Sequence, residues 1–416
     1  MRTDKMLLRA FGVERAVVQG AHWERYRGRQ TLVLHVRPYR CEERRCSKCG
    51  RRCPRYDRGS GPRRWRCLDV GLCAAYLQAE APRVRCPEHG VVVQRVPWAR
   101  PGARFTRLFE DLVAWLAVRT DRSTCSRLLN IAWATVGRIL QRVAHSAEQQ
   151  RNPLQGLRRI GIDEVSFRKG QRYLTVVVDH DSGRLLWAAE GRNEQTVRQF
   201  FELLGPERSA RIQLVSADAA SWIRKVVRER CPNAKLCLDP FHVVQWATEA
   251  LDEVRRSVWN QLRRSGQHER AKTLKNARWA LWKNPELLTE PQRATLASIE
   301  RDNKPLFRAY LLKEQLRSVF QQPEPADAAA ILDKWTAWAS RSRLAPFVRL
   351  ARTIRRHREA IEQVLRHRLS NARIEAMNTK IRLLTRLAFG FHSPKPLIAL
   401  AMLKLGGLCP PLPLRP

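Results

Sequence analysis

Acidic residues end several short apolar runs in the middle of the sequence. Asp163, Asp218 and Asp239 each close a run whose composition is typical of a β-strand. Carboxylates at the ends of neighbouring strands point into one crevice, where oxygen ligands bind hard divalent cations. An alternative is that each Asp only caps the helix that follows it. Helix capping is a good explanation for any one of these residues, but a poorer one for all three in succession. The pattern therefore favours a cation site.

The elements around these carboxylates are those of a mixed α/β domain. After the first carboxylate, residues 173–179 and 184–190 predict the two strands of a hairpin, with a Ser- and Gly-containing turn at 181–183. Helical patterns follow the two later strands, at 219–230 and from about 241. We therefore expect strands and helices to alternate through this part of the chain.

A second constellation lies nearer the N-terminus, where seven cysteines fall between Cys41 and Cys86. Cys46 and Cys49 form one knuckle and Cys86 and His89 another, each with two residues between the ligands and Gly after the second. Such turns bring both ligands to one ion, and Gly permits a positive φ. We expect a Cys3His tetrahedron around one structural Zn²⁺. Chance pairing is the alternative, and a ligand swap stays open because other cysteines lie nearby: Cys41, Cys53, Cys67 and Cys73.

The charge balance predicts a polyanionic partner. The 416 residues include 78 Lys and Arg against 39 Asp and Glu, a net charge of +39 that runs through the whole sequence. Such a field attracts a nucleic-acid backbone, although a basic proteome is an alternative source of part of the bias.

No apolar run reaches the ~18–20 residues of a membrane span. The N-terminus has no secretory apolar segment, and the odd number of cysteines favours a reducing compartment.

Helical segments separate the cysteine-rich region from the acidic one. A linker at 98–104 precedes helical spacing over 105–118, a second helical piece starts near Ser123, and a third opens at 133–135. A helix, a brief turn and a helix that carries Arg138 and Arg142 indicate a helix-turn-helix, in which these two arginines contact DNA. A plain helical bundle linker is the alternative interpretation.

The C-terminal part is predicted to be almost wholly helical over 241–370 and again from about 371. The Trp residues of this region are expected to pack between helices. The sequence leaves open which of them stack on exposed bases beside basic side chains. They are Trp246, Trp259, Trp279, Trp282, Trp335 and Trp338.

Taken together, these motifs resemble the ISL-three family of bacterial insertion-sequence transposases, in the same order along nearly the whole chain. Besides the two knuckles, the segments that carry the resemblance are 97–106, Gly161-Ile162-Asp163-Glu164, 173–179, 239–244 and 370–378. That family is of the DDE type, with an RNase H-like catalytic fold. The resemblance implies an α/β, RNase H-like catalytic domain with a mostly helical insertion, preceded by a zinc ribbon and a helix-turn-helix region.

The resemblance also implies roles for individual residues. Asp163, Asp218 and Glu375 would be the three catalytic carboxylates and the ligands of magnesium. Asp239 and His242 would support the site without binding the catalytic metals directly. Two Mg²⁺ or Mn²⁺ ions roughly 3.5–4 Å apart can stabilise both the attacking and the leaving oxygen of a phosphodiester. No covalent protein nucleophile is then required.

The implied function is DNA transposition. Such an enzyme binds the terminal inverted repeats of an insertion sequence as double-stranded DNA and catalyses metal-dependent strand cleavage and strand transfer into target DNA. Two alternatives use the same features: an RNase H-like nuclease or resolvase, and a non-catalytic zinc-ribbon DNA-binding regulator. By analogy with enzymes that bridge two DNA ends, we expect a homodimer or higher oligomer. We expect no membrane association and a bacterial cytoplasmic location.

These expectations divide the chain into six parts. They are N-terminal strands and the zinc ribbon (1–97), the helix-turn-helix region (98–150), the RNase H-like core (151–242), the helical insertion (243–369), the helix that closes the catalytic core (370–408) and a disordered tail (409–416). This order places Asp163 and Asp218 on adjacent strands and Glu375 on a helix that returns over them.

Overall fold

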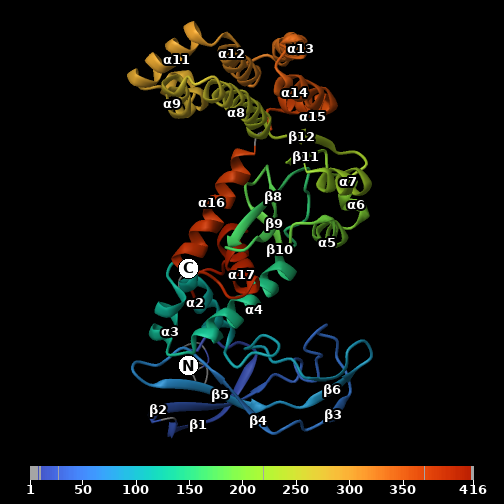
Figure 1. The fold of residues 1–416 in the computed structure, drawn as a ribbon. Coiled ribbons are helices and arrows are strands. Elements are labelled where there is room, and N and C mark those ends of the chain that lie inside the picture. Colours follow the sequence, from blue (N-terminus) through green and yellow to red (C-terminus); the bar gives the residue numbers. More distant parts are fainter. Residues whose placement is uncertain (1–7, 9–10, 27, 219, 370, 414–416) are drawn as a thin grey trace. The chain divides into compact units, whose positions relative to one another are not determined.

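The computed structural model describes Leu8 and residues 11–26, 28–218, 220–369 and 371–413. The chain forms two compact units, one built from 1–153 together with 383–416 and the other from 154–382 (Figure 1). The first unit contains two sheets and the second contains one, and each unit has its own buried core. Ser370, at the expected start of the closing segment, and 414–416 of the expected disordered tail lie outside the described residues.

The first unit begins with two small sheets. Their strands are β1 (Ala16–Tyr26), β2 (Arg29–Pro38), β3 (Arg55–Asp57), β4 (Pro62–Arg66), β5 (Ala74–Glu80), β6 (Arg83–Cys86) and β7 (Gly90–Val93). One sheet has the order β1-β2-β5-β4 and the other β3-β6-β7. Apolar residues of β2, β4 and β5, including Leu34, Trp65 and Leu77, pack with Trp98 into one core. The β3-β6-β7 sheet carries the second predicted knuckle at its β6-β7 turn.

Helices α2 (Arg107–Ala117), α3 (Arg122–Leu129) and α4 (Trp133–Arg151) follow the sheets. The Thr106 side chain caps α2, and Asp121 caps α3 by accepting the Ser123 N–H at 2.8 Å. Asn130 ends α3 in the left-handed conformation, with φ of 47°, and turns the chain into α4. Near the C-terminus, α17 (Pro394–Leu405) packs against α4 in the same unit.

The second unit is built on a mixed sheet. Its strands are β8 (Arg159–Arg168), β9 (Arg172–Asp179), β10 (Leu185–Glu190), β11 (Leu214–Ala217) and β12 (Lys235–Leu238), in the order β10-β9-β8-β11-β12. The first three strands pair antiparallel, whereas β11 is parallel to both β8 and β12. Helices α5 (Glu194–Leu204), α6 (Pro206–Ser209) and α7 (Ser221–Arg230) connect the later strands. This is the RNase H-like arrangement, and the predicted fold class is confirmed.

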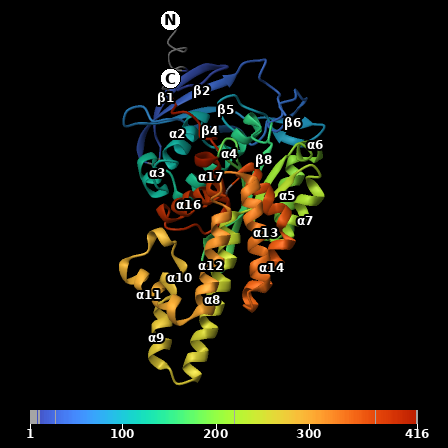
Figure 2. The same cartoon turned by 90° about the horizontal axis from the view of Figure 1, so that it is seen from above.

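A helical insertion follows β12. Its elements are α8 (Pro240–Arg264), α9 (His268–Asn276), α10 (Arg278–Trp282), the 3-10 turn η1 (Pro285–Leu287), α11 (Glu290–Asp302), α12 (Lys304–Val319), α13 (Pro325–Arg341), α14 (Ala345–Arg356) and α15 (Arg358–His367). The long helices α8 and α12 lie side by side (Figure 2). Trp335 is fully buried in their common core, where its Nε1 donates to the Leu312 carbonyl at 2.7 Å. Trp279, by contrast, is 59% exposed.

The segment expected to close the catalytic core contains α16 (Ala372–Leu387) as well as α17. The boundary between the two units falls within α16, after Arg382. Beyond α17 the chain is irregular, and the Cys409 N–H donates to the Leu403 carbonyl at 3.0 Å. All eleven cysteines have free thiols. None of the described helices is long and apolar enough to cross a membrane.

Candidate functional site

The register of the parallel strands places three Asp residues at one edge of the sheet in the second unit. Ile162 of β8 pairs with Ala217 of β11, and Ala217 pairs with Leu238 of β12. In each strand the next residue is an aspartate: Asp163, Asp218 and Asp239. Their carboxylates leave the sheet at the same level, because the parallel pairing of β8, β11 and β12 stops there in register. The prediction that Asp163 ends its strand is wrong, since β8 continues to Arg168 in antiparallel pairing with β9.

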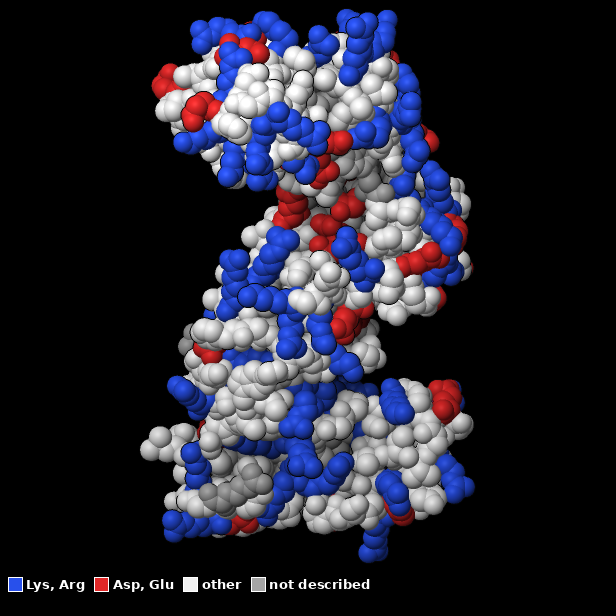
Figure 3. All heavy atoms as spheres, viewed as in Figure 1, with Lys and Arg blue, Asp and Glu red and all other residues white. Residues whose placement is uncertain are grey.

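The structure brings these carboxylates into two overlapping groups. The ligand atoms of Asp163, Glu164 and Asp218 lie within 4.8 Å of one another, and so do those of Asp218, Asp239 and His242. His242 Nε2 forms an ion pair with Asp218 Oδ1 and lies 3.9 Å from Asp239 Oδ2. In Figure 3 acidic side chains gather between the insertion helices and the sheet of this unit, on a face where Lys and Arg predominate elsewhere.

Burial and mutual repulsion make this group electrostatically unfavourable without a cation. Burial, followed by the charge of Asp218, raises the pKa of Asp163 to about 6. Burial also raises the pKa of Glu164, although Arg192 lies 3.0 Å from its carboxylate and opposes that shift. The Glu164 Oε1 atom is buried and has no hydrogen-bond partner among the described residues. Oxygen donors of this kind suit a divalent cation.

Helix capping, the simpler explanation of these aspartates, applies to one of them. Asp239 Oδ1 accepts the Phe241 N–H at 3.3 Å and caps α8. Asp218 caps no helix, because α7 begins at Ser221 without a side-chain cap. Asp163 lies within β8, where its Oδ1 accepts the N–H of Glu164 at 2.7 Å. Capping therefore leaves Asp163 and Asp218 unexplained.

Helix α16 supplies Glu375 and Asn378 to the same unit. Asn378 Nδ2 donates to Asp163 Oδ2 at 2.7 Å, and Asn378 is only 3% exposed. Glu375 lies one turn earlier on the helix, is exposed, and does not belong to either of the close acidic groups among the described residues. The pKa of Asp239 is raised mainly by burial, and the charge of Glu375 contributes to the shift. Glu375 therefore lies beside the group rather than within it.

A glycine on the central strand lets α16 approach the sheet closely. A Cβ atom on Gly161 would lie 2.1 Å from Ile374 Cδ1 and 2.8 Å from His180 Nε2. Arg373, next to Ile374, donates to the His180 carbonyl, and His180 Nε2 lies 2.7 Å from Ser216 Oγ. These contacts hold the first turns of α16 against β8 and so fix where Glu375 and Asn378 lie.

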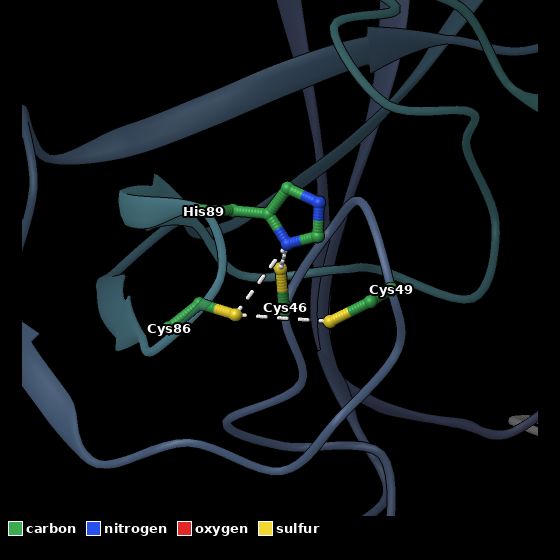
Figure 4. A group of neighbouring side chains, drawn as sticks. All are labelled: Cys46, Cys49, Cys86 and His89. Atoms are coloured by element: carbon green, nitrogen blue, oxygen red, sulfur yellow. Dashed lines mark hydrogen bonds between the residues drawn. The ribbon is translucent and has the colours of Figure 1, made fainter.

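The second predicted constellation, in the first unit, converges on one point (Figure 4). His89 Nδ1 lies 3.8 Å from Cys46 Sγ and 3.5 Å from Cys86 Sγ, and Cys49 Sγ lies 3.7 Å from Cys86 Sγ. Bonds of about 2.3 Å to sulfur and about 2.0–2.1 Å to nitrogen place tetrahedral ligands roughly 3.5–3.8 Å apart. The four side chains thus fit a zinc ion.

The knuckle backbone and the thiols support this arrangement. Gly50 and Gly90 have φ of 73° and 66°, in the region predicted from their place after the second ligands. Burial opposes ionisation of Cys86, but hydrogen bonds from His89 and from backbone N–H groups lower its pKa to about 6. Among the described residues no other cysteine joins this group, although Cys53 is buried beside it.

The two arginines predicted to contact DNA have different surroundings in α4. Arg138 is exposed, and its Nη2 donates to Thr135 Oγ1 at 3.2 Å. Arg142 donates to Glu110 Oε1 at 2.8 and 2.5 Å, and the Glu110 side chain is fully buried. Arg100 also pairs with Glu110, at 3.4 Å. Arg142 therefore holds α2 and α4 together, whatever else it contacts.

Both arginines line a hollow of about 780 Å³ in the first unit, between α4 and the strand β4. Arg66 on β4 donates to the Asn130 carbonyl at 2.9 Å and so ties the sheet to the turn of the helix pair. Three arginines of the hollow form no ion pair with a carboxylate among the described residues: Arg63, Arg104 and Arg138. This surface suits a phosphate backbone.

Sequence reasoning missed several residues of these sites. The sequence predicts no role for Glu164 and does not predict that Asn378 contacts Asp163. The Glu375-to-Asn378 spacing was a usable signal, because residues three apart share a helix face. Nothing in the sequence around Glu110 predicts that this residue is buried and pairs with Arg142.

Comparison with known protein families matches all three regions. The model described as "Transposase", for the DDE domain of family ISL3, matches residues 160–401. The "Helix-turn-helix domain of transposase family ISL3" matches 94–144, and the "zinc-finger of transposase IS204/IS1001/IS1096/IS1165" matches 42–89. The predicted order of zinc ribbon, helix-turn-helix and catalytic domain is thereby confirmed.

Curated relatives agree along nearly the full length. The chain is 53% identical over 401 residues to the transposase for insertion sequence element IS1557 of Mycobacterium tuberculosis strains CDC 1551 and H37Rv, covering 92% of this chain and 90% of each relative. It is 28% identical over 384 residues to the transposase for IS1001 of Bordetella parapertussis, covering 92% of both chains. The chain belongs to the ISL3 family of insertion-sequence transposases and is a DDE-type DNA transposase.

Proposed function

We propose that Asp163, Asp218 and Glu375 hold the catalytic divalent cations of this transposase, two Mg²⁺ or Mn²⁺ ions per site. The observation that carries the proposal is the strand register, which places Asp163 beside Asp218 at the edge of the sheet. The buried Glu164 Oε1, which has no hydrogen-bond partner among the described residues, supports the proposal because it leaves an oxygen donor free for a cation. Such cations supply Lewis-acid stabilisation of the attacking and leaving oxygens in phosphodiester cleavage and strand transfer.

The neighbouring residues position these carboxylates. His242 pairs with Asp218 and keeps that carboxylate turned toward Asp163. Asp239 caps α8 and thereby orients the first turn of the helix, which carries His242. Asn378 donates to Asp163 Oδ2, which leaves the remaining lone pairs of that carboxylate for a cation. Asp239 and His242 thus support the site without binding the catalytic metals directly.

The first unit supplies DNA recognition in this proposal. The helix pair α3-α4 and the arginine-lined hollow beside it take the terminal inverted repeats. Cys46, Cys49, Cys86 and His89 bind one structural Zn²⁺, which holds the β3-β6-β7 sheet in shape. Two DNA ends must be bridged, so the working state is a homodimer or higher oligomer. We further propose a bacterial cytoplasmic location, which thiolate ligands and a DNA substrate both favour.

The experiment uses linear DNA that carries one element end, incubated with the full-length protein in Mg²⁺ or in EDTA. Asp163→Asn, Asp218→Asn and Glu375→Gln each remove one charge and should abolish cleavage and joining while end binding survives. Asp179→Asn is the matched control, because that carboxylate serves the hairpin turn by accepting the Ser182 N–H at 3.1 Å. Glu190→Gln is a second control, at the exposed end of β10. Full activity of any one of the three variants would remove that residue from the assignment.

A pre-cleaved end with a free 3′-hydroxyl measures strand transfer separately from hydrolysis. Joining of this end to a second DNA is the expected outcome for the wild-type protein. Hydrolysis without joining would contradict the transfer step and leave a nuclease with the same site.

A further inference from the structure

Three arginines in the second unit form a cluster without a neutralising carboxylate. Arg224 and Arg228 lie four residues apart on α7, so they share one helix face, and Arg356 is the last residue of α14. Among the described residues none of the three forms an ion pair. Other arginines of the unit are paired, for example Arg198 with Glu194 and Arg358 with Asp333.

A neutral histidine orients one arginine of the cluster. Arg224 Nη1 lies 3.0 Å from His357 Nδ1. A guanidinium can only donate, so Nδ1 must accept, and the His357 ring is therefore neutral. Burial, and after it the charges of Arg224, Arg356 and Arg228, lower the pKa of His357 in agreement with this geometry. The contact orients Arg224 without cancelling its positive charge, as a carboxylate would.

The cluster also has unused donor capacity. Arg224 is half-buried, and its Nε atom is buried without a hydrogen-bond partner among the described residues. Arg228 and Arg356 are exposed to solvent. Mutual repulsion lowers the pKa of Arg224 further, after burial. Such a group of unpaired guanidiniums, one of them oriented by His357, matches the oxygens of a phosphodiester backbone.

Two connections place the cluster beside the proposed catalytic carboxylates. Along α8, His242 pairs with Asp218, and Trp246 lies one turn later on the same face. The Trp246 ring packs against His357, with ring centroids 5.6 Å apart. Along the chain, α7 begins three residues after Asp218 and carries Arg224. One helical turn advances about 5.4 Å, and neighbouring phosphates of one DNA strand are ~3.4 Å apart along the axis. A DNA strand that reaches from the carboxylates to the cluster would therefore span a few phosphates.

We propose that Arg224, Arg228 and Arg356 form a phosphate-binding site that holds the DNA backbone next to the reacting phosphodiester. The inference rests on the proposed function, because it takes the carboxylate edge as the place of reaction. It adds a DNA contact on the catalytic unit itself, separate from the helix-turn-helix that recognises the ends. Between the cluster and the carboxylates, the half-buried Trp246 and the buried, neutral His357 carry no charge that would repel the strand.

The test measures DNA affinity against salt concentration in EDTA, where no cleavage occurs. The full-length protein is titrated with DNA that carries an element end and with DNA of random sequence. The variant Arg224→Gln/Arg228→Gln/Arg356→Gln should lose about tenfold or more in affinity, and its log–log salt slope should shrink by roughly 2–3, because each lost phosphate contact removes about 0.9. If the variant loses affinity only for the element-end DNA, the site binds end DNA. If it loses affinity for both DNAs, the site binds any duplex.

A charge-matched control separates a specific site from a general change in net charge. The variant Arg293→Gln/Arg349→Gln/Arg366→Gln removes three arginines of the same unit that are paired with Glu290, Glu253 and Glu362. Its salt slope should stay at the wild-type value. The replacement of all three cluster arginines by Lys should also keep the slope, since the charges remain.

An unchanged slope in the Gln cluster variant with both DNAs, or an equal loss in the control, would overturn the proposal. Thermal unfolding establishes that each variant is folded. If the triple variant does not fold, Arg356→Gln alone carries the test, with an expected slope change of about one. The binding test uses neither metal nor cleavage, so its result does not depend on which carboxylates are catalytic. Conversely, an unchanged salt slope would disprove the phosphate-binding site without affecting the assignment of the carboxylates.

Discussion

Asn378 Nδ2 donates a 2.7 Å hydrogen bond to Asp163 Oδ2 and thereby joins α16 to the central strand of the catalytic sheet. A partner of this kind orients a metal ligand, and its loss typically weakens metal binding by about 10–100-fold. We predict that Asn378→Ala raises the Mg²⁺ concentration for half-maximal cleavage by roughly tenfold or more. Asn378→Asp should be worse, since it places a like charge against Asp163.

The control for Asn378 is Thr379→Ala, the exposed neighbour on the same helix. This variant should keep the wild-type Mg²⁺ dependence. The position would have only a structural role if Asn378→Ala lowered the maximal rate without moving the Mg²⁺ dependence.

The zinc assignment predicts about one Zn²⁺ per purified chain, measured by metal analysis. Cys46→Ser should lose the metal and lower the melting temperature of the first unit, because ligand binding contributes folding free energy. Cys67→Ser is the control: Cys67 is buried in the apolar core of the larger sheet and should not affect zinc content.

His89→Ala tests the fourth ligand separately. Its Nδ1 lies within ligand distance of two thiols, so this variant should bind zinc more weakly than the wild-type protein. Full zinc content in His89→Ala, together with loss in Cys53→Ser, would show that Cys53 completes the tetrahedron instead.

The arginines of α4 should separate DNA binding from stability. Arg138→Ala removes an exposed charge from the hollow and should weaken end binding several-fold with an unchanged melting temperature. Arg142→Ala leaves the buried Glu110 with Arg100 alone, and breaking a buried pair costs about 3–5 kcal/mol. It should therefore lower the melting temperature by many degrees, as thermal unfolding would measure.

A second substitution distinguishes the two roles of Arg142. Glu110→Gln combined with Arg142→Met removes both charges and should recover much of the lost stability. If Arg142→Ala kept the wild-type melting temperature but lost end binding, the arginine would be a DNA contact and the structural interpretation would fail.

Local pattern was enough to anticipate the arrangement of the strands and of the zinc knuckles. Asp163 and Asp218 each directly follow the last residue pair of the parallel β8–β11 ladder, so the apolar runs before them indicate which edge they reach, although β8 itself continues beyond Asp163. The Gly50 and Gly90 conformations likewise follow from the turn that the knuckle requires. Such features depend on residues close together in the sequence.

Contacts between distant residues could not be anticipated in this way. Asn378 and Asp163 are 215 residues apart, and their pairing depends on how α16 packs on Gly161. The packing of α17 against α4 joins the C-terminal segment to the helix-turn-helix unit, although the sequence had suggested only a closing helix for the catalytic core. Asp239 shows a further difficulty of prediction from sequence. This residue caps α8 and also belongs to the acidic group, so the local explanation and the functional one are both correct and the sequence cannot separate them.

Without a bound cation, the acidic group around Asp163 should make the wild-type protein less stable than the variant Asp163→Asn. Burial and the charge of Asp218 raise the pKa of Asp163 to about 6, so at neutral pH the ionised carboxylate is less favourable in the folded state than in the unfolded chain, where water solvates it. Asp163→Asn removes that charge and should stabilise the protein in EDTA by on the order of 1–3 kcal/mol. The melting temperature of the unit should rise by several degrees.

Added Mg²⁺ should reverse the ranking of the two proteins. The wild-type melting temperature should rise with Mg²⁺ concentration, because an ion that binds only the folded state stabilises it by mass action. Asp163→Asn should show little or no rise. Ser166→Ala is the control: Ser166 lies on the same strand, is exposed, and belongs to neither acidic group, so this variant should respond as the wild type does. An equal Mg²⁺ response in Asp163→Asn and the wild type would mean that the cation binds elsewhere.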